Sequence, residues 1–389
     1  MKMWKKAAAE AIGDLKKYLE TYGRFPFSAY PFNEVDSLLL CQLSYLRYDG
    51  LVPGIRVNED SVSLGELGSD PRKERMFRKI LFEAENRALF EALVVSRRFQ
   101  TLKLNCYVNC VDRERETQFA AVTYLLESGI VYVAFRGTDE SFVGWKEDFN
   151  MAFLYPVPGQ IYAAKYLNIV AGKFSGAFYV GGHSKGGNFA IYGAMNCAGQ
   201  VRNRIMRIYN MDGPGFRPEI LRSDRYKRIA DRVERYLPYS SVIGMLFATD
   251  GRYRVVQAKG SGLIQHNPSH WRVCNGHFVT AEHISDKIRR IDDRLNMWIL
   301  AMDSEQCRLL VDALYRIVLA TQTNDLPTFA ADWRRNMTKI LWAIRETDEE
   351  TKRFLRQNLH GLFGAWRNRD RTRAPGKVVL SGSSRSGCH

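Results

Sequence analysis

Residues 177–192, AFYVGGHSKGGNFAIY, join an apolar strand-like run to a helix-compatible run through a glycine-rich turn. The turn contains the pattern G-x-S-x-G as Gly182-His183-Ser184-Lys185-Gly186. Because glycine and serine are common residues, the pattern alone is a weak signal. Its place between a strand and a helix makes it more specific, because a nucleophile elbow lies at such a junction. Glycines at 182 and 186 let the backbone fold tightly around the serine. The segment therefore predicts Ser184 as a nucleophile at a helix N-terminus, whose unpaired N–H groups favour an oxyanion.

A glycine-rich turn between a strand and a helix is also compatible with a phosphate-binding loop. Neither a dinucleotide-binding G-x-G-x-x-G pattern nor a P-loop G-K-[ST] occurs in this stretch. We therefore favour the nucleophile over the phosphate site.

Strands and helices alternate around this segment. Strand-like runs occur at about 101–111, 118–126, 130–136, 178–180, 205–211, 232–237 and 253–258. Helical patterns occur at 186–198, near 217–228 and at 241–248. This alternation predicts an α/β fold with a mostly parallel central sheet that is covered on both faces.

Helical segments flank the alternating region. Helices are expected over residues 1–23, from a capping-style start at Asn33, and over 73–97, with a loop at 53–72. Apolar residues at helical spacing predict helices again over 279–366. We therefore expect an N-terminal helical segment packed on the core (1–100), a hydrolase-like core (101–278), a C-terminal helical region (279–366) and a basic, disordered tail (367–389).

The composition of the 389 residues, with 46% hydrophobic residues, is that of an ordinary folded protein. No apolar run reaches the roughly 18 residues of a membrane-spanning helix, and no apolar signal-peptide core follows the basic start. These features predict a cytoplasmic protein. The seven cysteines are scattered and do not complete a recognisable zinc site, so we expect no metal.

The net charge of +15 favours an anionic partner, either nucleic acid or an anionic membrane surface. No nucleic-acid-binding signature accompanies the charge, so we expect no nucleic-acid partner. Peripheral contact with an anionic membrane is kept as a hypothesis. The oligomeric state is not indicated by the sequence.

A second motif strengthens the interpretation of Ser184. The strand-like run Val131 to Phe135 ends in Arg136-Gly137-Thr138, and Trp145-Lys146-Glu147-Asp148 follows. Together with the serine turn, these segments resemble the class 3 lipase branch of the α/β hydrolases. There, Arg-Gly-Ser/Thr, Trp-x-x-Asp and Gly-His-Ser-x-Gly-Gly occur in this order.

The resemblance is closer still to the Mbeg-like family of bacterial lipase-like hydrolases. Further segments carry it: Phe32 to Asp36, Asp212-Gly213-Pro214-Gly215-Phe216 and Gln265-His266. It covers roughly residues 25–360 and implies an α/β-hydrolase fold and a serine hydrolase, without fixing a substrate. It also implies that Thr138 and Lys185 donate their backbone N–H groups to an oxyanion and that Asp148 holds the Thr138 hydroxyl. A solvated turn acid is the alternative for Asp148.

A serine nucleophile needs a base, and in this fold the acid and then the histidine follow the serine along the chain. His266 comes one short loop after the strand-like run 253–258, and the family pattern also places the base there. We favour His266 over His270, because Asn267-Pro268 prevents a helix that would pair the two histidines. His183, next to the serine, is interpreted as a packing residue of the turn.

The sequence identifies the acidic residue that would orient His266 less clearly than it identifies the serine and the histidine. Hydrolases of this type place it after the strand that precedes the histidine strand, but Pro238-Tyr239-Ser240-Ser241 follows 232–237 and has no carboxylate. Asp212 follows the neighbouring strand at the correct edge of the sheet, and Asp250 lies at the opposite edge. We choose Asp212. A turn role for Asp212 in Asp212-Gly213-Pro214-Gly215 is the alternative, with Ser240, Ser241 or a water orienting His266 instead.

The predicted chemistry is acyl transfer to water through a Ser184 acyl-enzyme, without a metal or organic cofactor. By resemblance to lipases, the substrate is a small-molecule or lipid carboxylic ester. A thioesterase or amidase would use the same machinery, which the sequence does not separate. A non-catalytic binding protein that retains the hydrolase fold is a further alternative, supported by the absent carboxylate after Leu237.

Overall fold

The computed structural model describes residues 12–127, 129–139, 141–319 and 353. Within these residues, nine strands form one sheet in the order β1-β2-β3-β4-β5-β6-β7-β8-β11. Their bounds are β1 Val62–Ser63, β2 Lys103–Asp112, β3 Thr117–Leu125, β4 Val131–Phe135, β5 Phe178–His183, β6 Ile205–Met211, β7 Val233–Pro238, β8 Arg254–Val256 and β11 Thr280–Ala281. Strands β4 to β8 pair in parallel, and antiparallel pairs lie at both ends of the sheet. Since β2 points the same way as β4, the sheet is mostly parallel, as predicted.

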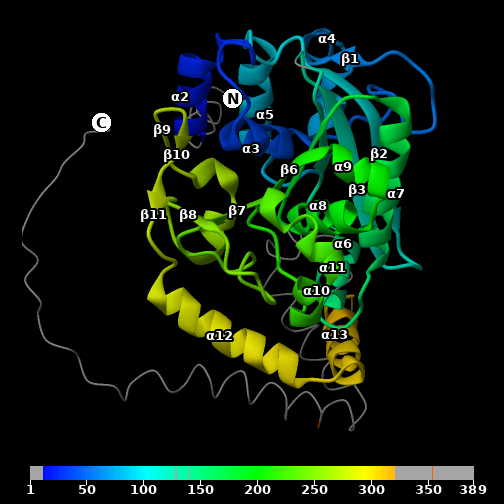
Figure 1. Cartoon of the computed structure of the whole chain (residues 1–389), viewed down its shortest axis with the longest axis vertical. Helices are drawn as coiled ribbons and strands as arrows, with labels where there is room; N and C mark the ends of the chain where they lie inside the picture. The colour runs from blue at the N-terminus through cyan, green and yellow to red at the C-terminus, as the bar shows by residue number, and fades with distance from the viewer. Residues whose placement is uncertain (1–11, 128, 140, 320–352, 354–389) are drawn as a thin grey trace, which may run out of the picture.

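Helices lie on both sides of this sheet (Figure 1). Their bounds are α2 Gly13–Tyr22, α3 Glu34–Leu43, α4 Leu64–Ser69, α5 Glu83–Val94, α6 Phe142–Asn150, α7 Pro158–Lys173, α8 Lys185–Asn196, α9 Gly199–Arg204, α10 Pro218–Arg222, α11 Asp224–Lys227, α12 Asp286–Ala301 and α13 Ser304–Leu319. Short 3-10 turns are η1 Lys73–Phe77, η2 Ala230–Arg232, η3 Gly262–His266 and η4 Pro268–His270, and β9 Val273–Cys274 pairs with β10 His277–Phe278.

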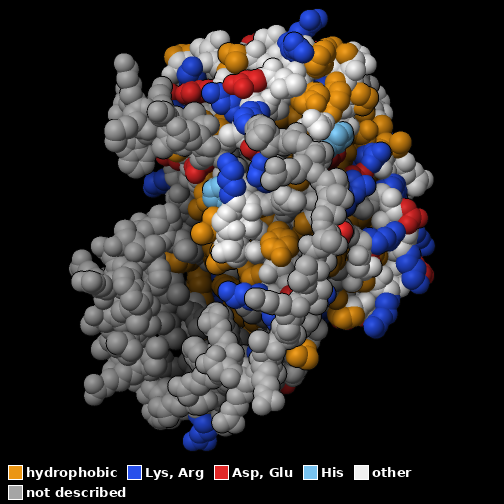
Figure 2. Space-filling model, turned by 90° about the vertical axis from the view of Figure 1, so that its left-hand side faces the viewer, with side chains coloured by type: hydrophobic (Ala, Val, Ile, Leu, Met, Phe, Trp, Pro, Cys, Tyr) orange, Lys and Arg blue, Asp and Glu red, His pale blue; other side chains and the backbone are white. Residues whose placement is uncertain are grey.

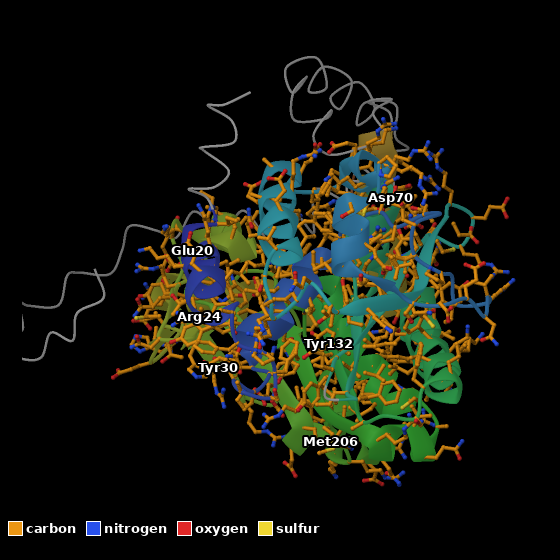
Figure 3. All side chains as sticks on the ribbon, turned by 90° about the horizontal axis from the view of Figure 1, so that it is seen from above. Glu20, Arg24, Tyr30, Asp70, Tyr132 and Met206 are labelled. Carbon is orange, nitrogen blue, oxygen red and sulfur yellow. The ribbon has the colours of Figure 1, made fainter. Side chains whose placement is uncertain are left out.

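The alternation of side chains along β4 shows how the sheet is covered on both faces. Tyr132 and Ala134 share a buried cluster with α3, whereas Val131, Val133 and Phe135 share a second cluster with α7 and α8. Successive side chains of a strand point to opposite faces, so each strand supplies both clusters. In the view from above, Tyr132 lies in the interior and Met206, which is 57% exposed, lies at the periphery (Figure 3). The mixed α/β class predicted from the alternation is confirmed.

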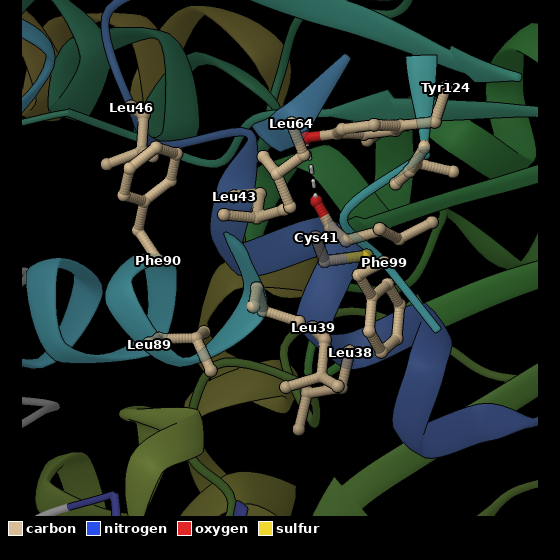
Figure 4. Close-up of a cluster of buried hydrophobic side chains, with 14 of the residues drawn as sticks. Leu38, Leu39, Cys41, Leu43, Leu46, Leu64, Leu89, Phe90, Phe99 and Tyr124 are labelled. Carbon is tan, nitrogen blue, oxygen red and sulfur yellow. Dashed lines mark hydrogen bonds between the residues drawn. The ribbon is translucent and has the colours of Figure 1, made fainter. Parts of the chain in front are cut away.

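The N-terminal layer is built around α3. The Asn33 side chain caps this helix by accepting hydrogen bonds from the N–H groups of Val35 and Asp36, and the Asp36 carboxylate accepts one from the Asn33 N–H. The predicted helix start is therefore confirmed. Leucines of α3 lie between the α5 side chains and the ring of Phe99 (Figure 4). The hydroxyl of Tyr124, from β3, donates to the carbonyl of Leu40 at 3.3 Å. This packing fixes the N-terminal helices on one face of the sheet.

Three predicted helices differ from the structure, each for its own reason. The helix predicted near 217–228 is divided into α10 and α11, because Ser223 ends the first and caps the second through the Tyr226 N–H. The helix predicted over 73–97 is divided into η1 and α5, because Lys79 and Phe82 adopt left-handed backbone with φ of 53° and 54°. The segment 241–248 is a turn and not a helix. There, the Gly244 N–H donates to the Asp212 carboxylate at 3.1 Å, which holds the chain around that side chain.

Two segments differ in extent from the predictions, and two others cannot be compared with them. The loop predicted at 53–72 contains β1 and α4, which Ser63 caps through a hydrogen bond from the Glu66 N–H. The C-terminal helices begin at Asp286 and not at 279, because Thr280–Ala281 pairs with β8. The remainder of the predicted helical region beyond residue 319, apart from residue 353, and the tail at 367–389 lie outside the described residues.

Candidate active site

Ser184 occupies a strained turn between β5 and α8. Its φ is 58° and its ψ is −133°, a conformation that costs on the order of 1–3 kcal/mol for a residue with a side chain. A Cβ on Gly182 would lie 2.2 Å from the backbone carbon of Gly186, and a Cβ on Gly186 would lie 2.1 Å from the Phe135 oxygen. Only glycine fits at both positions, so the two glycines of the pattern are explained by close packing of backbone on backbone.

The segment Arg136-Gly137-Thr138 lies directly beside Ser184. A Cβ on Gly137 would lie 3.1 Å from the Ser184 Cβ and 2.7 Å from the His183 oxygen. On the other side of the serine, α8 begins at Lys185, so the Lys185 N–H is one of the first four of the helix and has no partner within it. The structure thus places both the loop that carries Thr138 and the first residue of α8 next to Ser184.

Arg136 fixes the loop that carries Thr138. Its guanidinium is almost fully buried and lies 3.1 Å from Asn109 Oδ1 and 3.2 Å from Asp139 Oδ2. Although burial opposes it, the Arg136 charge together with hydrogen bonds from Ser141 holds the pKa of Asp139 below its usual value. Ionised Asp139 in turn accepts from the Ser141 N–H at 2.9 Å, which ties the loop to the start of α6.

Asp148 of α6 contacts Thr138 directly. The Thr138 hydroxyl donates to the Asp148 carboxylate. Burial of the carboxyl group raises the pKa of Asp148 to about 6, and the Lys185 ammonium opposes that rise. Helix α6 approaches the loop closely because Gly144 faces it, and a Cβ there would lie 2.9 Å from Thr138 Cγ2. The contact that the family resemblance implies between Asp148 and Thr138 is therefore present.

His266 and Asp212 form a hydrogen-bonded pair. His266 Nδ1 lies 2.7 Å from Asp212 Oδ2, with the Asp212 side chain 1% exposed and that of His266 20% exposed. A carboxylate only accepts, so Nδ1 of the neutral ring carries the proton and Nε2 is the basic nitrogen. No hydrogen bond between Ser184 Oγ and His266 Nε2 is found among the described residues. Such bonds are often long in ligand-free sites and tighten when substrate binds.

Asp212 is held by the turn that follows β7. Its Oδ1 accepts from the Ser241 hydroxyl at 2.5 Å and from the Gly244 N–H at 3.1 Å. Ser241 therefore contacts Asp212 and not the His266 ring. Ser240 uses its N–H to donate to Gln265 Oε1 at 2.6 Å, on the loop that carries His266.

The other titratable candidates have different partners. Asp250 accepts from the Tyr226 hydroxyl at 2.8 Å and from Arg252. His270 Nδ1 lies 2.8 Å from the Ile264 oxygen. Neither residue contacts the pair formed by His266 and Asp212.

Sequence reasoning missed two sets of contacts around Ser184. His183 bonds with the Tyr45 hydroxyl and with the His266 backbone, although it was expected only to pack. The Lys185 side chain forms a fully buried ion pair with Glu147. The partners are far from the serine turn along the chain, so no local pattern marks them.

The described residues contain no group of three His, Cys, Asp or Glu side chains that could hold a metal ion. In the same part of the chain, no helix is both long enough and apolar enough to cross a membrane. Lys and Arg side chains are interspersed with hydrophobic and acidic ones on the face shown in Figure 2. Leu263 and Ile264, just before His266, are 64% and 57% exposed.

A family model described as Mbeg1-like matches residues 93–316. The chain belongs to the Mbeg1-like family. The matched span includes the serine turn, the Arg136-Gly137-Thr138 loop and the pair formed by His266 and Asp212. The family resemblance drawn from the sequence motifs is therefore confirmed.

Comparison with other proteins adds little to this Mbeg1-like assignment. A solved structure described as "Rhizomucor miehei lipase propeptide complex, native" is 17% identical, with a TM-score of 0.31. The match covers 47% of this chain and 63% of the lipase chain, which is less than two thirds of that chain. Among curated proteins, none matches the chain.

Proposed function

We propose that this Mbeg1-like protein is a serine hydrolase with an α/β-hydrolase fold that cleaves carboxylic esters, as lipases and phospholipases do. The single observation that carries the proposal is the contact of 2.7 Å between His266 Nδ1 and Asp212 Oδ2. It leaves His266 Nε2 basic on the loop beside the strained Ser184 turn. If the Ser184 turn had only a structural role, it would not need a histidine with a basic nitrogen on the neighbouring loop.

In the proposed reaction, His266 Nε2 takes the proton of the Ser184 hydroxyl while Oγ attacks the ester carbonyl carbon. The N–H groups of Thr138 and Lys185 donate to the resulting oxyanion, and loss of one such donor typically costs about 10²–10³ in rate. His266 then protonates the leaving alcohol, which leaves an acyl-enzyme. Water, deprotonated by His266, then attacks the acyl carbon; the bond from that carbon to Ser184 Oγ breaks, and His266 returns its proton to Oγ as the acid leaves. In this proposal the protein supplies the nucleophile, the base, the acid and the oxyanion donors, and water is the second reactant.

The surroundings of His266 support the proposed substrate class. Exposed Leu263 and Ile264 precede it, and Tyr239, 40% exposed, follows β7 on the neighbouring turn. Apolar side chains at the rim of a site favour a small uncharged or lipid-like ester over a charged one. Contact with an anionic membrane is part of the same proposal, and salt-sensitive association with liposomes tests it. The cytoplasmic location stays a prediction.

The alternative of a non-catalytic binding protein had one argument, the absent carboxylate after Leu237. In the proposed mechanism Asp212 supplies that carboxylate from the neighbouring strand β6. Thioesterase and amidase activities share the machinery, and rates on matched esters, thioesters and amides separate them.

The experiment is labelling with a fluorophosphonate probe, which needs an activated serine beside an oxyanion hole. We expect wild type to be labelled, Ser184→Ala to remain unlabelled, and the control Ser175→Ala, an exposed serine before β5, to be labelled like wild type. A folded wild-type protein that stays unlabelled with and without detergent would refute the proposal.

A further inference from the structure

The Lys185 side chain, next to Ser184, points into the protein and forms a buried ion pair. Its Nζ lies 2.9 Å from Glu147 Oε2, and both side chains are 0% exposed. Removing two charges from water costs several kcal/mol per ion, so such a pair is weak support for stability. A methionine or leucine would fill the same space without that cost. The position of the pair suggests another role.

Every charged atom of the pair has a partner. The Lys185 ammonium donates to Glu147, to the Gln118 oxygen at 3.2 Å and to the Gly144 oxygen at 3.4 Å, which accounts for its three N–H groups. Glu147 also accepts from the Gln118 N–H at 3.0 Å and from the Gly159 N–H at 2.9 Å. A fully satisfied network of this kind holds its members in one arrangement.

The network joins the two halves of the proposed oxyanion hole. Lys185 is the first residue of α8 and supplies one N–H donor. Glu147 is followed on α6 by Asp148, which holds the hydroxyl of Thr138, the residue of the second donor. Gly144 accepts from Lys185 and also faces the Thr138 methyl group. The ion pair therefore links α6 and Thr138 to the start of α8.

We propose that Lys185 and Glu147 are positioning residues that set the spacing between the Lys185 and Thr138 N–H donors. The inference rests on the proposed function, because it concerns donors to that oxyanion. Neither side chain touches the reacting atoms. Both act through the backbone and through Asp148.

The test uses the double variant Lys185→Met/Glu147→Gln in the full chain. Each single variant leaves one buried charge without its partner and is expected to fold poorly, whereas the double variant removes both charges at nearly constant volume. The matched control is Lys146→Met/Glu116→Gln, because Lys146 is the neighbouring residue on α6 and its ion-pair partners, Glu116 and Asp312, do not belong to α8. Thermal unfolding checks that both double variants are folded.

We expect fluorophosphonate labelling of Ser184 to slow by about 10–100-fold in the Lys185→Met/Glu147→Gln protein. We expect kcat for ester hydrolysis to fall by the same factor with KM changed less than about twofold, as for an interaction used only in the transition state. The control pair is expected to label at the wild-type rate. Wild-type labelling and kcat in the folded double variant would overturn the inference.

Hydrogen exchange provides a readout that does not depend on catalysis. In the Lys185→Met/Glu147→Gln protein we expect amides of α6 and of the first turn of α8 to exchange faster together, by about tenfold or more. Unchanged protection in either segment would overturn the link between them. If the wild type is not labelled, the proposed function fails, and exchange still decides whether the pair joins the two helices.

Discussion

His183 Nε2 lies 2.9 Å from the backbone oxygen of His266, and the two imidazole rings are 4.6 Å apart between centroids. A carbonyl only accepts, so Nε2 carries the proton and Nδ1 accepts from the Tyr45 hydroxyl at 2.8 Å. Burial, together with nearby His266, holds the pKa of His183 well below its usual value, so the ring stays neutral. The residue before Ser184 therefore anchors the loop that carries His266.

Replacing His183 with Phe tests this anchor. His183→Phe keeps a ring for stacking but removes the acceptor of the Tyr45 O–H and the donor to the His266 carbonyl, and each loss costs about 1–3 kcal/mol of stability. We expect kcat for ester hydrolysis to fall by about 10–100-fold, because a displaced base no longer reaches Ser184. His277→Phe, at a side chain 60% exposed, is the control. Full kcat in folded His183→Phe would show that the loop does not need this anchor.

Asp212→Asn tests the proposed acid. The amide oxygen can still accept from Ser241 and Gly244, but the carboxylate that stabilises the charged His266 ring is lost. We expect kcat to fall by about 10⁴ with the fold retained. Asp250→Asn, which alters a carboxylate paired with Tyr226 and Arg252, is expected to keep its kcat. A variant at 212 with nearly full turnover would mean that another group, such as a water, orients His266.

The parts of the fold that could be predicted are those that local patterns encode. Apolar β-runs mark β2 to β6, and the glycines around Ser184 mark the turn between β5 and α8. The turn at 241–248 could not be predicted in this way, because Asp212 holds it across 32 residues of sequence. At 79 and 82, left-handed backbone interrupts a pattern that is otherwise helical.

The candidate site also has a part that the sequence could predict and a part that it could not. Ser184 and Asp212 each follow a parallel strand, and the carboxyl ends of such strands meet at one edge of a sheet. Their approach to one another follows from topology. Tyr45 reaches His183 across 138 residues, and Glu147 reaches Lys185 across 38. Contacts of that range depend on how the layers pack, which a single sequence does not reveal.

The raised pKa of Asp148 predicts a change of stability with pH. Burial raises that pKa from 3.8 to about 6, so between these values the folded protein binds more protons than the unfolded chain. The contribution of this carboxyl to stability is therefore full below about pH 4 and is lost as the pH rises through about 6. Asp148→Asn removes the titration. We expect the stability of this variant relative to wild type to increase from about pH 4 to about pH 7.

Urea unfolding midpoints at a series of pH values measure this difference. Asp224→Asn, at a side chain 83% exposed, is the control and should show no comparable trend relative to wild type. A difference between Asp148→Asn and wild type that stays constant over this range would mean that the Asp148 carboxyl does not titrate near pH 6 in the folded protein.

Gly144→Ala tests whether α6 sets the position of Thr138. The new methyl group would lie 2.9 Å from Thr138 Cγ2 and 3.0 Å from Gln118 Oε1, so the loop or the helix must move. Such overpacking costs about 1–3 kcal/mol, and displacement of the Thr138 N–H should slow fluorophosphonate labelling of Ser184 by about tenfold or more. Gly172→Ala, in α7 with nothing within 4 Å of the new methyl, is the matched control. That control is expected to gain up to about 1 kcal/mol of stability and to label like wild type. Equal labelling of the two alanine variants would mean that the distance between α6 and Thr138 does not control the reactivity of Ser184.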